Sequence, residues 1–514
     1  MGKRKSVWIL KAMVWVIFVM CIFSPGLTQA KAPEGKLTQA IHWPVSANWF
    51  DPATGNPGTL GWFALSVLHD ALVKPMPEGT YTPCLAESYS HNENYTVYEF
   101  KLRKGVKFHN GDPVTAEDVV FSFYRYKSRL AKLLHGITEK VEAVDPHLVR
   151  FQFKRPFPDF LEYFLPGATC IGWIVPKKYM EKVGDAGFRQ KPVGAGPYKI
   201  VEFVPGVKLV VEAFEDYWRK VPNIKTIEFK LIRDRSTRLA MVKRGEADVA
   251  TLITDILMEE VKKDPNLRLL TPLSPVRFPL FPTEQWNPKS PWSDIRVRQA
   301  ASLALDRQAL ADIHAPGCKP SGSIGIEGGS DPMVAEFPAD PYDPANAKKL
   351  MAEAGYPNGF DGGTFYPNEL YWGYAEQVAT YWKAIGISVK MTRLERAAWF
   401  ALRDSGKMKG AVVMDIAAGS TITSRLAYLL GPQTPYGRYP DIMALWEQFQ
   451  KEYKPDIRKD LSMRIQKLMH DKVMMIPLTG INSPAAVGPR VKGDPYKTQP
   501  LLWYTAPLED IELK

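Results

Sequence analysis

Residue types that carry catalysis are present in the sequence, but their spacing matches no familiar catalytic or metal-binding pattern. The eight histidines are scattered, and no two share one face of an expected helix. No G-x-S-x-G, H-E-x-x-H or C-x-x-C motif occurs. Two carboxylate pairs, Glu259-Glu260 and Asp340 with Asp343, have the chemistry for acid–base work, but such acids usually lie on solvated helices and turns. We therefore expect no catalytic residue, no metal and no cofactor.

The N-terminus has the three parts of a secretory signal. Lys3, Arg4 and Lys5 give a basic start, residues 12–23 are apolar, and residues 28–30 offer a small-residue cleavage site. The apolar run is short for a membrane span, although an uncleaved anchor stays open as an alternative. We expect residues 1–30 to be removed and the mature protein to be exported to the periplasm.

Three cysteines lie beyond this signal: Cys84, Cys170 and Cys318. They are far apart in the sequence, so the close spacing of a zinc site is absent. One disulfide with one free thiol is compatible with an oxidising compartment, and three buried thiols are equally compatible. The pairing stays open.

Length and charge narrow the class of protein. A chain of 514 residues is too long for one ordinary core, so we expect two or three domains. The contents of 45% hydrophobic and 24% charged residues are those of a soluble globular protein. Losing the signal lowers the formal net charge from +11 to +7, and no dense Lys/Arg block remains. We expect no nucleic-acid partner.

The stretch 98–126 has the clearest local pattern. Its first residues alternate between apolar and charged, which is the period of a half-buried strand. Thr115 is expected to cap a helix, because its hydroxyl can accept a backbone N–H of the first turn. Asp118, three residues on, takes a capping-box position. His109, Asn110 and Asp112 between them are interpreted as turn residues, since they lack metal-ligand spacing.

Residues 104–119, KGVKFHNGDPVTAEDV, are similar to the most recognisable motif of one family. It is the family of bacterial extracellular solute-binding proteins of the dipeptide, oligopeptide and nickel type, the soluble receptors of ABC importers. Further similar motifs follow in the family's order: VGAGPY at 193–198, GEADV at 245–249 and SDIRVRQAASLALDR at 293–307. Ala195 replaces the family's usual Thr. The resemblance covers nearly the whole chain beyond the signal.

The resemblance implies an α/β fold of two lobes, a type II periplasmic binding protein with an extra subdomain inserted in the first lobe. The boundaries that we expect are a signal at 1–30, the first lobe at 31–77, the inserted subdomain at 78–192, the first lobe again at 193–271, the second lobe at 272–482 and a return to the first lobe at 483–514.

Several elements follow from local signals. Asp343-Pro344 predicts a helix start, and Gly355 its end. Residues 371–385 are predicted to be a helix, and 387–391 a strand. Ser236 is expected to cap another helix. Residues 273–288 form part of a proline-rich segment, interpreted as an irregular crossing between lobes, and 481–489 is interpreted as a loop.

The resemblance also implies a ligand cleft, whose walls would use aromatic side chains for area and a few polar groups for orientation. The candidates for ligand contact are Trp49, Trp62, Trp286, Tyr366, Glu369, Tyr371, Trp372, Arg396, Trp399 and Asp415. For each aromatic residue, packing in a core is the competing interpretation.

The ligand implied by the resemblance is a peptide or a peptide-like small solute. Peptide receptors of the family hold the ligand's ammonium with an Asp in a segment that matches 412–423, where the only acid is Asp415. An opine, an oligosaccharide or another small organic solute is the alternative within the class, and a secreted hydrolase or a chemosensory binding partner is the alternative outside it. The implied partners are an ABC permease and ATPase at the inner membrane, and we expect a monomer.

Overall fold

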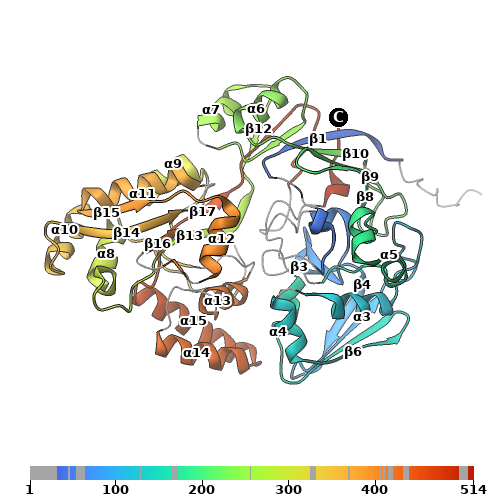
Figure 1. Ribbon diagram of the computed structural model, residues 1–514, viewed down its shortest axis with the longest axis horizontal. Helices are drawn as coiled ribbons and strands as arrows, with labels where there is room; N and C mark the ends of the chain where they lie inside the picture. The colour runs from blue at the N-terminus through green and yellow to red at the C-terminus, as the bar shows by residue number, and fades with distance from the viewer. Residues whose placement is uncertain are drawn as a thin grey trace, which may run out of the picture. The chain divides into compact units, whose positions relative to one another are not determined.

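The chain beyond the predicted signal is built on two large β-sheets and two smaller ones (Figure 1). A computed structural model describes residues 32–43, 45, 47–53, 64–127, 129–164, 172–254, 256–324, 331–367, 371–405, 407–408, 411–414, 421–431, 439–496 and 507–514. Pro33–Lys514 forms one unit, which contains every element named below.

The first lobe is organised by a seven-stranded sheet. Its strands, in spatial order, are β12 (Arg268–Leu270), β18 (Ala485–Val487), β11 (Val249–Thr251), β1 (Glu34–Ile41), β10 (Ile224–Leu231), β9 (Lys208–Ala213) and β8 (Tyr198–Val204). β1 is parallel to both β10 and β11, and its last five residues are all buried. A strand covered on both faces is expected for the parallel centre of a mixed sheet.

The second lobe is organised by a five-stranded sheet. Its strands, in spatial order, are β15 (Ile387–Met391), β14 (Phe360–Pro367), β16 (Ala411–Met414), β13 (Leu273–Pro282) and β17 (Ile476–Asn482). β15, β14 and β16 run parallel, whereas β13 is antiparallel to both of its neighbours.

Two smaller sheets lie within the first lobe. The four-stranded sheet has the order β4 (Ala86–His91), β5 (Val97–Leu102), β7 (Leu148–Phe153) and β6 (Thr138–Asp145), and the hairpin pairs β2 (Val73–Met76) with β3 (Gly79–Pro83). The alternation predicted for residues 98–102 is confirmed, because Tyr98, Phe100 and Leu102 are each at most 1% exposed. The ring of Phe100 meets the ring of Phe151 edge-on at 5.5 Å between centroids.

Helices cover these sheets. The α-helices with described bounds are α3 (Ala116–Arg125), α4 (Arg129–Ile137), α5 (Lys177–Gln190), α6 (Arg235–Lys243), α7 (Ile256–Lys263), α8 (Ile295–Leu303), α9 (Arg307–His314), α10 (Pro344–Glu353), α11 (Trp372–Ala384), α12 (Arg396–Asp404), α13 (Ile422–Leu430), α14 (Pro440–Lys451) and α15 (Pro455–Asp471). The 3-10 helices are η1 (Ala47–Phe50), η2 (Phe160–Phe164), η3 (Pro291–Ser293) and η6 (Leu508–Asp510).

The helix ends follow the capping signals in most cases. Thr115 is the N-cap of α3, and Asp118 reaches back to accept the Thr115 backbone N–H at 2.8 Å. Asp343 caps α10, as predicted. The prediction for Ser236 was wrong: Asp234 caps α6 instead and accepts the Thr237 N–H at 2.7 Å. A carboxylate two residues earlier is the better acceptor for the first turn.

The interpretation of 273–288 as irregular was wrong for its first ten residues, which form β13. Its prolines fit because β13 pairs with β17 in an interrupted ladder, with register shifts between Ser274 and Pro279. The interpretation of 481–489 as a loop was also wrong, since this segment contains β18. Irregular antiparallel pairing tolerates residues that would break a regular central strand.

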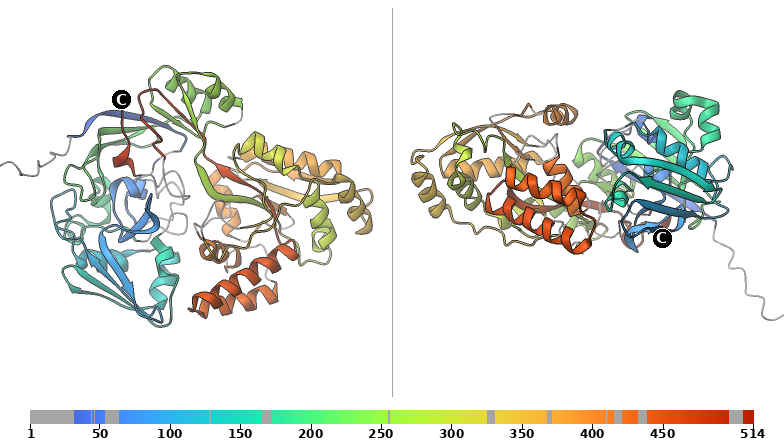
Figure 2. Two further views of the ribbon diagram at one scale, coloured as in Figure 1. Left: turned by 180° about the vertical axis from the view of Figure 1, so that it is seen from behind. Right: turned by 90° about the horizontal axis from the view of Figure 1, so that it is seen from below.

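A two-stranded ribbon joins the two large sheets. β12 pairs with β18 in the first lobe, and their continuations β13 and β17 pair in the second, so both chain segments cross side by side (Figure 2). The crossings fall at Thr271-Pro272 and Ser483-Pro484, where the Ser483 N–H donates to the Pro272 carbonyl at 3.2 Å. If the lobes move relative to one another, the described chain therefore needs to bend at these two crossings.

Two of the sequence motifs touch one another. The Gly194 N–H donates to His109 Nδ1 at 3.3 Å, and His109 Nε2 donates to the Gly196 carbonyl at 2.9 Å. An imidazole with one accepting and one donating ring nitrogen is neutral. Burial favours this neutral form and lowers the pKa of His109 to about 3. His109 thus joins residues 104–119 to residues 193–198, whereas Asn110 and Asp112 bond to each other within the turn.

The cysteines are only partly described. Cys84 and Cys318 are buried and form no disulfide with one another, and Cys170 lies outside the described residues. His69 is fully buried and bonds through Nε2 to the Phe50 carbonyl at 2.9 Å, and burial lowers its pKa to about 4. A histidine with no exposed surface acts as a packing residue here.

Candidate functional site

The carboxyl ends of three neighbouring parallel strands meet at one edge of the five-stranded sheet. Phe365 of β14 lies opposite Met391, the last residue of β15, and Pro367, the last residue of β14, lies opposite Met414, the last residue of β16. The chain leaves these strands within two residues of that register. Ligands of open α/β sheets bind outside such carboxyl ends, where the connecting segments diverge.

Most of the predicted contact residues lie on the segments that begin at this edge. Tyr366 is in β14, Tyr371 and Trp372 follow it, Arg396 and Trp399 are in α12 after β15, and Glu369 and Asp415 come directly after β14 and β16 in the sequence. Glu369 and Asp415 are outside the described residues, as is the side chain of Arg396. The topology thus brings together segments that the sequence separates by some fifty residues.

Trp372, the first residue of α11, has its ring held from two sides. Its indole N–H donates to Glu376 Oε1 at 2.5 Å, and the guanidinium carbon of Arg393 lies 4.5 Å from the ring centroid. The residue remains partly exposed, and so does its neighbour Tyr371. A fixed aromatic face within reach of solvent suits contact with a small organic molecule.

Trp399 and Tyr366 are placed differently. Trp399 is 1% exposed, and its indole N–H donates to the Tyr366 carbonyl at 3.3 Å. The guanidinium carbon of Arg403 lies 5.5 Å from the Trp399 ring centroid. Both aromatic residues pack with the apolar core beneath α13, α14 and α15. In this conformation Trp399 offers no surface to a solute, and half-buried Tyr366 offers a part of its ring.

In the first lobe, η1 follows the carboxyl end of β1 and contains Trp49. The side chain of Trp49 and all of Trp62 are outside the described residues. The next segment is fixed by Asp51, whose carboxylate accepts Arg125 Nη1 and Nη2 at 2.6 Å each. Arg125 also donates to Asp185 at 2.8 Å. Sequence reasoning missed this buried pair.

Trp286 is separated from the other candidates. It follows β13, and because β13 is antiparallel to β16, the end of β13 lies at the opposite edge of the sheet: Pro282 is level with Val412, at the start of β16. Its side chain is 46% exposed. The structure therefore does not bring Trp286 to the edge shared by the other second-lobe candidates.

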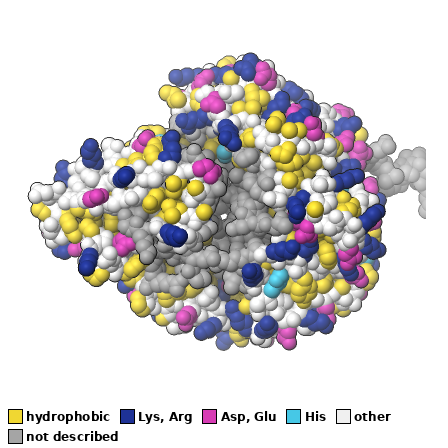
Figure 3. Space-filling model, in the orientation of Figure 1, with side chains coloured by type: hydrophobic (Ala, Val, Ile, Leu, Met, Phe, Trp, Pro, Cys, Tyr) yellow, Lys and Arg dark blue, Asp and Glu magenta, His cyan; other side chains and the backbone are white. Residues whose placement is uncertain are grey.

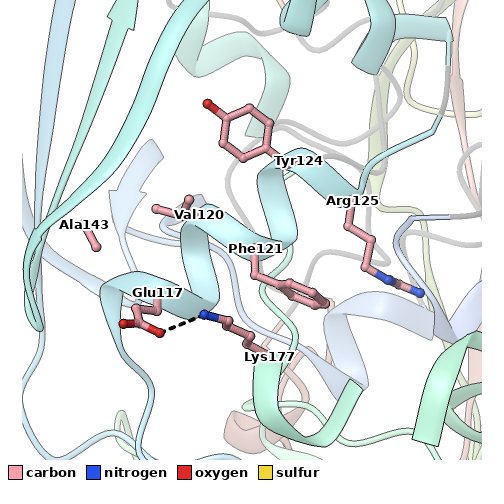
Figure 4. Close-up of a pocket in the computed structure, with 7 residues that line it drawn as sticks. All are labelled: Glu117, Val120, Phe121, Tyr124, Arg125, Ala143 and Lys177. Carbon is pink, nitrogen blue, oxygen red and sulfur yellow. Dashed lines mark hydrogen bonds and ion pairs between the residues drawn. The ribbon is translucent and has the colours of Figure 1, made fainter. Parts of the chain in front are cut away.

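A surface pocket of about 500 Å³ lies elsewhere, over α3 in the inserted subdomain. Its lining residues are Glu117, Val120, Phe121, Tyr124, Arg125, Ala143 and Lys177. Figure 4 shows Lys177 Nζ reaching Glu117, at 2.9 Å. None of the predicted contact residues that the structure describes lines this pocket.

In the part of the chain that the structure describes, no three His, Cys, Asp or Glu side chains gather so as to hold a metal ion. Among the same residues no helix has the length and apolar character needed to cross a bilayer. On the face in Figure 3, Lys and Arg are interspersed with Asp and Glu rather than gathered in one block.

Comparison with known proteins identifies the family of this chain and solved structures that share its fold. Residues 80–436 match the family model "Bacterial extracellular solute-binding proteins, family 5 Middle". Heme-binding protein A of Haemophilus influenzae is 27% identical over 451 residues, 80% of this chain and 81% of that protein. Glutathione-binding protein GsiB of Salmonella choleraesuis is 29% identical over 359 residues, 68% of each. A dipeptide binding protein from Pseudoalteromonas sp. SM9913, solved in complex with Met-Leu, shares the fold with a TM-score of 0.77 at 20% identity, covering 93% of this chain and 100% of that one.

Proposed function

Because the chain belongs to family 5 of the bacterial extracellular solute-binding proteins, we propose that it captures a peptide or a peptide-like small solute in the periplasm and delivers it to a membrane permease. The observation that carries the proposal is the shared carboxyl edge of β14, β15 and β16, from which the predicted contact segments begin. The protein acts as the receptor of an ABC importer, with a permease and an ATPase as partners, and it works as a monomer after removal of residues 1–30.

Capture occurs by hinge closure about the ribbon formed by β12–β13 and β17–β18. The crossings at Thr271-Pro272 and Ser483-Pro484 support the lobe boundaries that we propose before residue 272 and before residue 483. A solute shifts the balance of open and closed forms only by its extra affinity for the closed form. Periplasmic binding proteins are the standard example of this motion.

Two observations support a peptide-like solute. One relative is a glutathione-binding protein, and one protein of the same fold was solved with a dipeptide. The fixed ring of Trp372, between Glu376 and Arg393, supplies an apolar face next to groups of both charges. Such a face suits a solute that carries an amine, a carboxylate and an apolar side chain.

A thermal-shift screen tests the function. Mature protein is heated with di- and tripeptides, glutathione, opines, oligosaccharides and small organic acids. A solute present at 100 times its Kd stabilises the folded form by about 2.7 kcal/mol, which raises Tm measurably. A shift with peptides alone supports the proposal. A shift with another class alone assigns the alternative solute, and no shift together with hydrolysis of any compound contradicts a receptor.

Replacing Trp372 by alanine is expected to weaken solute binding about 10- to 100-fold, because the substitution removes a fixed aromatic contact. The change leaves folding intact, since Trp372 is partly exposed at the first turn of α11. Titration calorimetry with the best solute of the screen measures the effect. Trp286→Ala is the matched control, because Trp286 lies beyond the opposite edge of the sheet; equal losses in both variants would contradict this placement.

A further inference from the structure

The inserted subdomain and the second lobe are in direct contact far from the ribbon that joins the lobes. Residues 155–162 precede and enter η2, on the first lobe's side. Arg155 Nη1 donates to the Gln450 carbonyl at 3.1 Å, Asp159 forms an ion pair with Arg458, and Glu162 accepts the hydroxyl of Thr421. The partners belong to α13, α14 and α15 or their caps, 259 to 299 residues away along the chain.

We propose that Asp159 and Glu162 form a latch with Arg458 and Thr421 that holds the closed form together, and that closing this latch takes up a proton. The inference rests on the proposed hinge closure. None of the four residues is among the candidates for solute contact, so the latch contributes to the closing equilibrium even when no solute is bound. We define the closed form as the conformation with these four residues in contact.

Arg458 is held within the second lobe through Nη1, so that Nη2 can serve the latch. Its Nη1 donates to the Phe449 and Glu452 carbonyls at 3.1 and 3.0 Å, and its guanidinium carbon lies 4.1 Å from the Phe449 ring centroid. Nη2 pairs with Asp159. Because the Arg458 side chain is 5% exposed, separating the lobes removes its carboxylate partner and leaves a poorly hydrated cation.

Thr421 connects the latch to the proposed solute edge. It is the N-cap of α13, and its hydroxyl accepts the Ser424 N–H at 3.2 Å while it donates to Glu162. In the sequence it follows 415–420, the segment that comes after β16 and begins with Asp415. Closing the latch therefore fixes the far end of a segment that carries a predicted solute contact.

The surroundings of Glu162 favour its neutral form. Tyr81 of β3 donates to Glu162 Oε1 at 2.5 Å, and Thr421 donates to Oε2. Asp159 on its own segment and Asp331, which accepts the Ile422 N–H at 3.0 Å, are like charges nearby. Burial is the largest cause of a raised pKa at Glu162, and these two carboxylates add to it. The two hydrogen bonds act in the opposite direction, and the resulting pKa is about 7.

The remaining charges at the interface act on Asp159. Burial raises the pKa of Asp159, and Arg458 and Arg155 oppose the rise. Tyr81 faces Glu162 as well, and burial next to this carboxyl raises the pKa of the Tyr81 phenol. The phenol therefore stays neutral in the range where Glu162 titrates.

The sign of the pH effect follows from these surroundings. Opening the lobes returns water to Glu162, so its pKa falls towards the ordinary value of about 4.5, and the loss of the Thr421 hydrogen bond offsets only part of this fall because burial is the larger cause. The raised pKa belongs to the closed form, which therefore binds the extra proton. Closure is strongest below pH 4.5, weakens as the pH rises towards 7, and has lost this contribution above pH 7.

The test measures closure without any solute. Fluorescent labels are attached at Glu93→Cys in the inserted subdomain and Glu447→Cys on α14, both exposed positions, and energy transfer reports the ratio of closed to open molecules. Labelling of the chain without these two substitutions sets the background from Cys84, Cys170 and Cys318. The ratio is expected to fall about tenfold between pH 6 and pH 8.5.

Glu162→Gln keeps the shape but cannot ionise, so its ratio is expected to stay constant over this range and to be at least as high as that of the parent at pH 6, because the parent is fully neutral only below pH 4.5. Glu139→Gln, an exposed residue on β6, is the matched control and should follow the parent. Asp159→Asn is expected to lower the ratio at every pH, because it removes the partner of Arg458.

A parent protein whose ratio does not change with pH, or a Glu162→Gln variant that keeps the parent's slope, overturns the latch. Since no solute is present, this result is independent of the solute screen. A chain that failed to bind any solute would still show pH-dependent closure if the latch exists.

Discussion

Gly194→Ala is expected to destabilise the folded protein by at least about 3 kcal/mol, the upper part of the range for overpacked sites. A Cβ at Gly194 would lie 1.9 Å from the Leu68 carbonyl oxygen and 2.7 Å from His69 Nδ1. Relief by a small shift is blocked, because the Gly194 N–H is bonded to the His109 ring and its carbonyl accepts the His109 N–H at 2.8 Å. The close approach of two backbones, rather than an unusual φ, requires glycine here.

Denaturation by guanidinium chloride, followed by circular dichroism, measures this loss as a lower midpoint at unchanged slope. Gly136→Ala in α4 is the control, since a Cβ there meets nothing within 4 Å. Alanine is the better helix former, so this control is expected to be neutral or slightly stabilising. A Gly194→Ala variant within about 1 kcal/mol of the parent would contradict the close approach of Gly194 to Leu68 and His69.

Arg125→Ala is expected to cost about 3–5 kcal/mol, the range for removing one partner of a buried ion pair. Asp51 is 1% exposed and would lose both hydrogen bonds from the guanidinium while staying buried. Because Asp51 directly follows η1, which contains Trp49, the substitution is also expected to weaken solute binding. Thermal unfolding and calorimetry measure the two effects.

Lys127→Ala is the matched control for this substitution. Lys127 donates to the same Asp185 at 3.2 Å, but its side chain is 62% exposed, so its removal is expected to cost no more than about 0.5 kcal/mol. In a double-mutant cycle, Asp51→Ala with Arg125→Ala should cost clearly less than the two single changes added together. Additive losses would show that the pair does not act as a unit.

Patterns of short range were readable from the sequence. The alternation at 98–102 and the capping signals at Thr115 and Asp343 depend on neighbours within a few residues, and the structure confirms each of them. The two-lobed fold was predicted from an ordered set of motifs, and the family match supports it. The N-cap of α6 was predicted wrongly because both Ser236 and Asp234 can cap a helix, and only the backbone geometry decides between them.

Contacts of long range were not readable. Nothing local at His109 indicates that its ring holds Gly194 and Gly196, 85 and 87 residues away. The proline-rich start of 273–288 concealed β13, because its pairing partner β17 lies some two hundred residues further along the chain. The same limit applied to the candidate site. The sequence did not show in which direction β13 runs relative to β16. Because the two strands are antiparallel, Trp286, which follows β13, is separated from the other second-lobe candidates.

The most direct test of the account is native mass spectrometry of the mature protein with the solute that raises its Tm most. The account predicts one solute per chain, a complex whose mass stays constant over hours, and a released solute with its original mass. A second species that accumulates at the mass of a cleaved or modified solute would contradict the central claim that this chain binds its solute and passes it on unchanged.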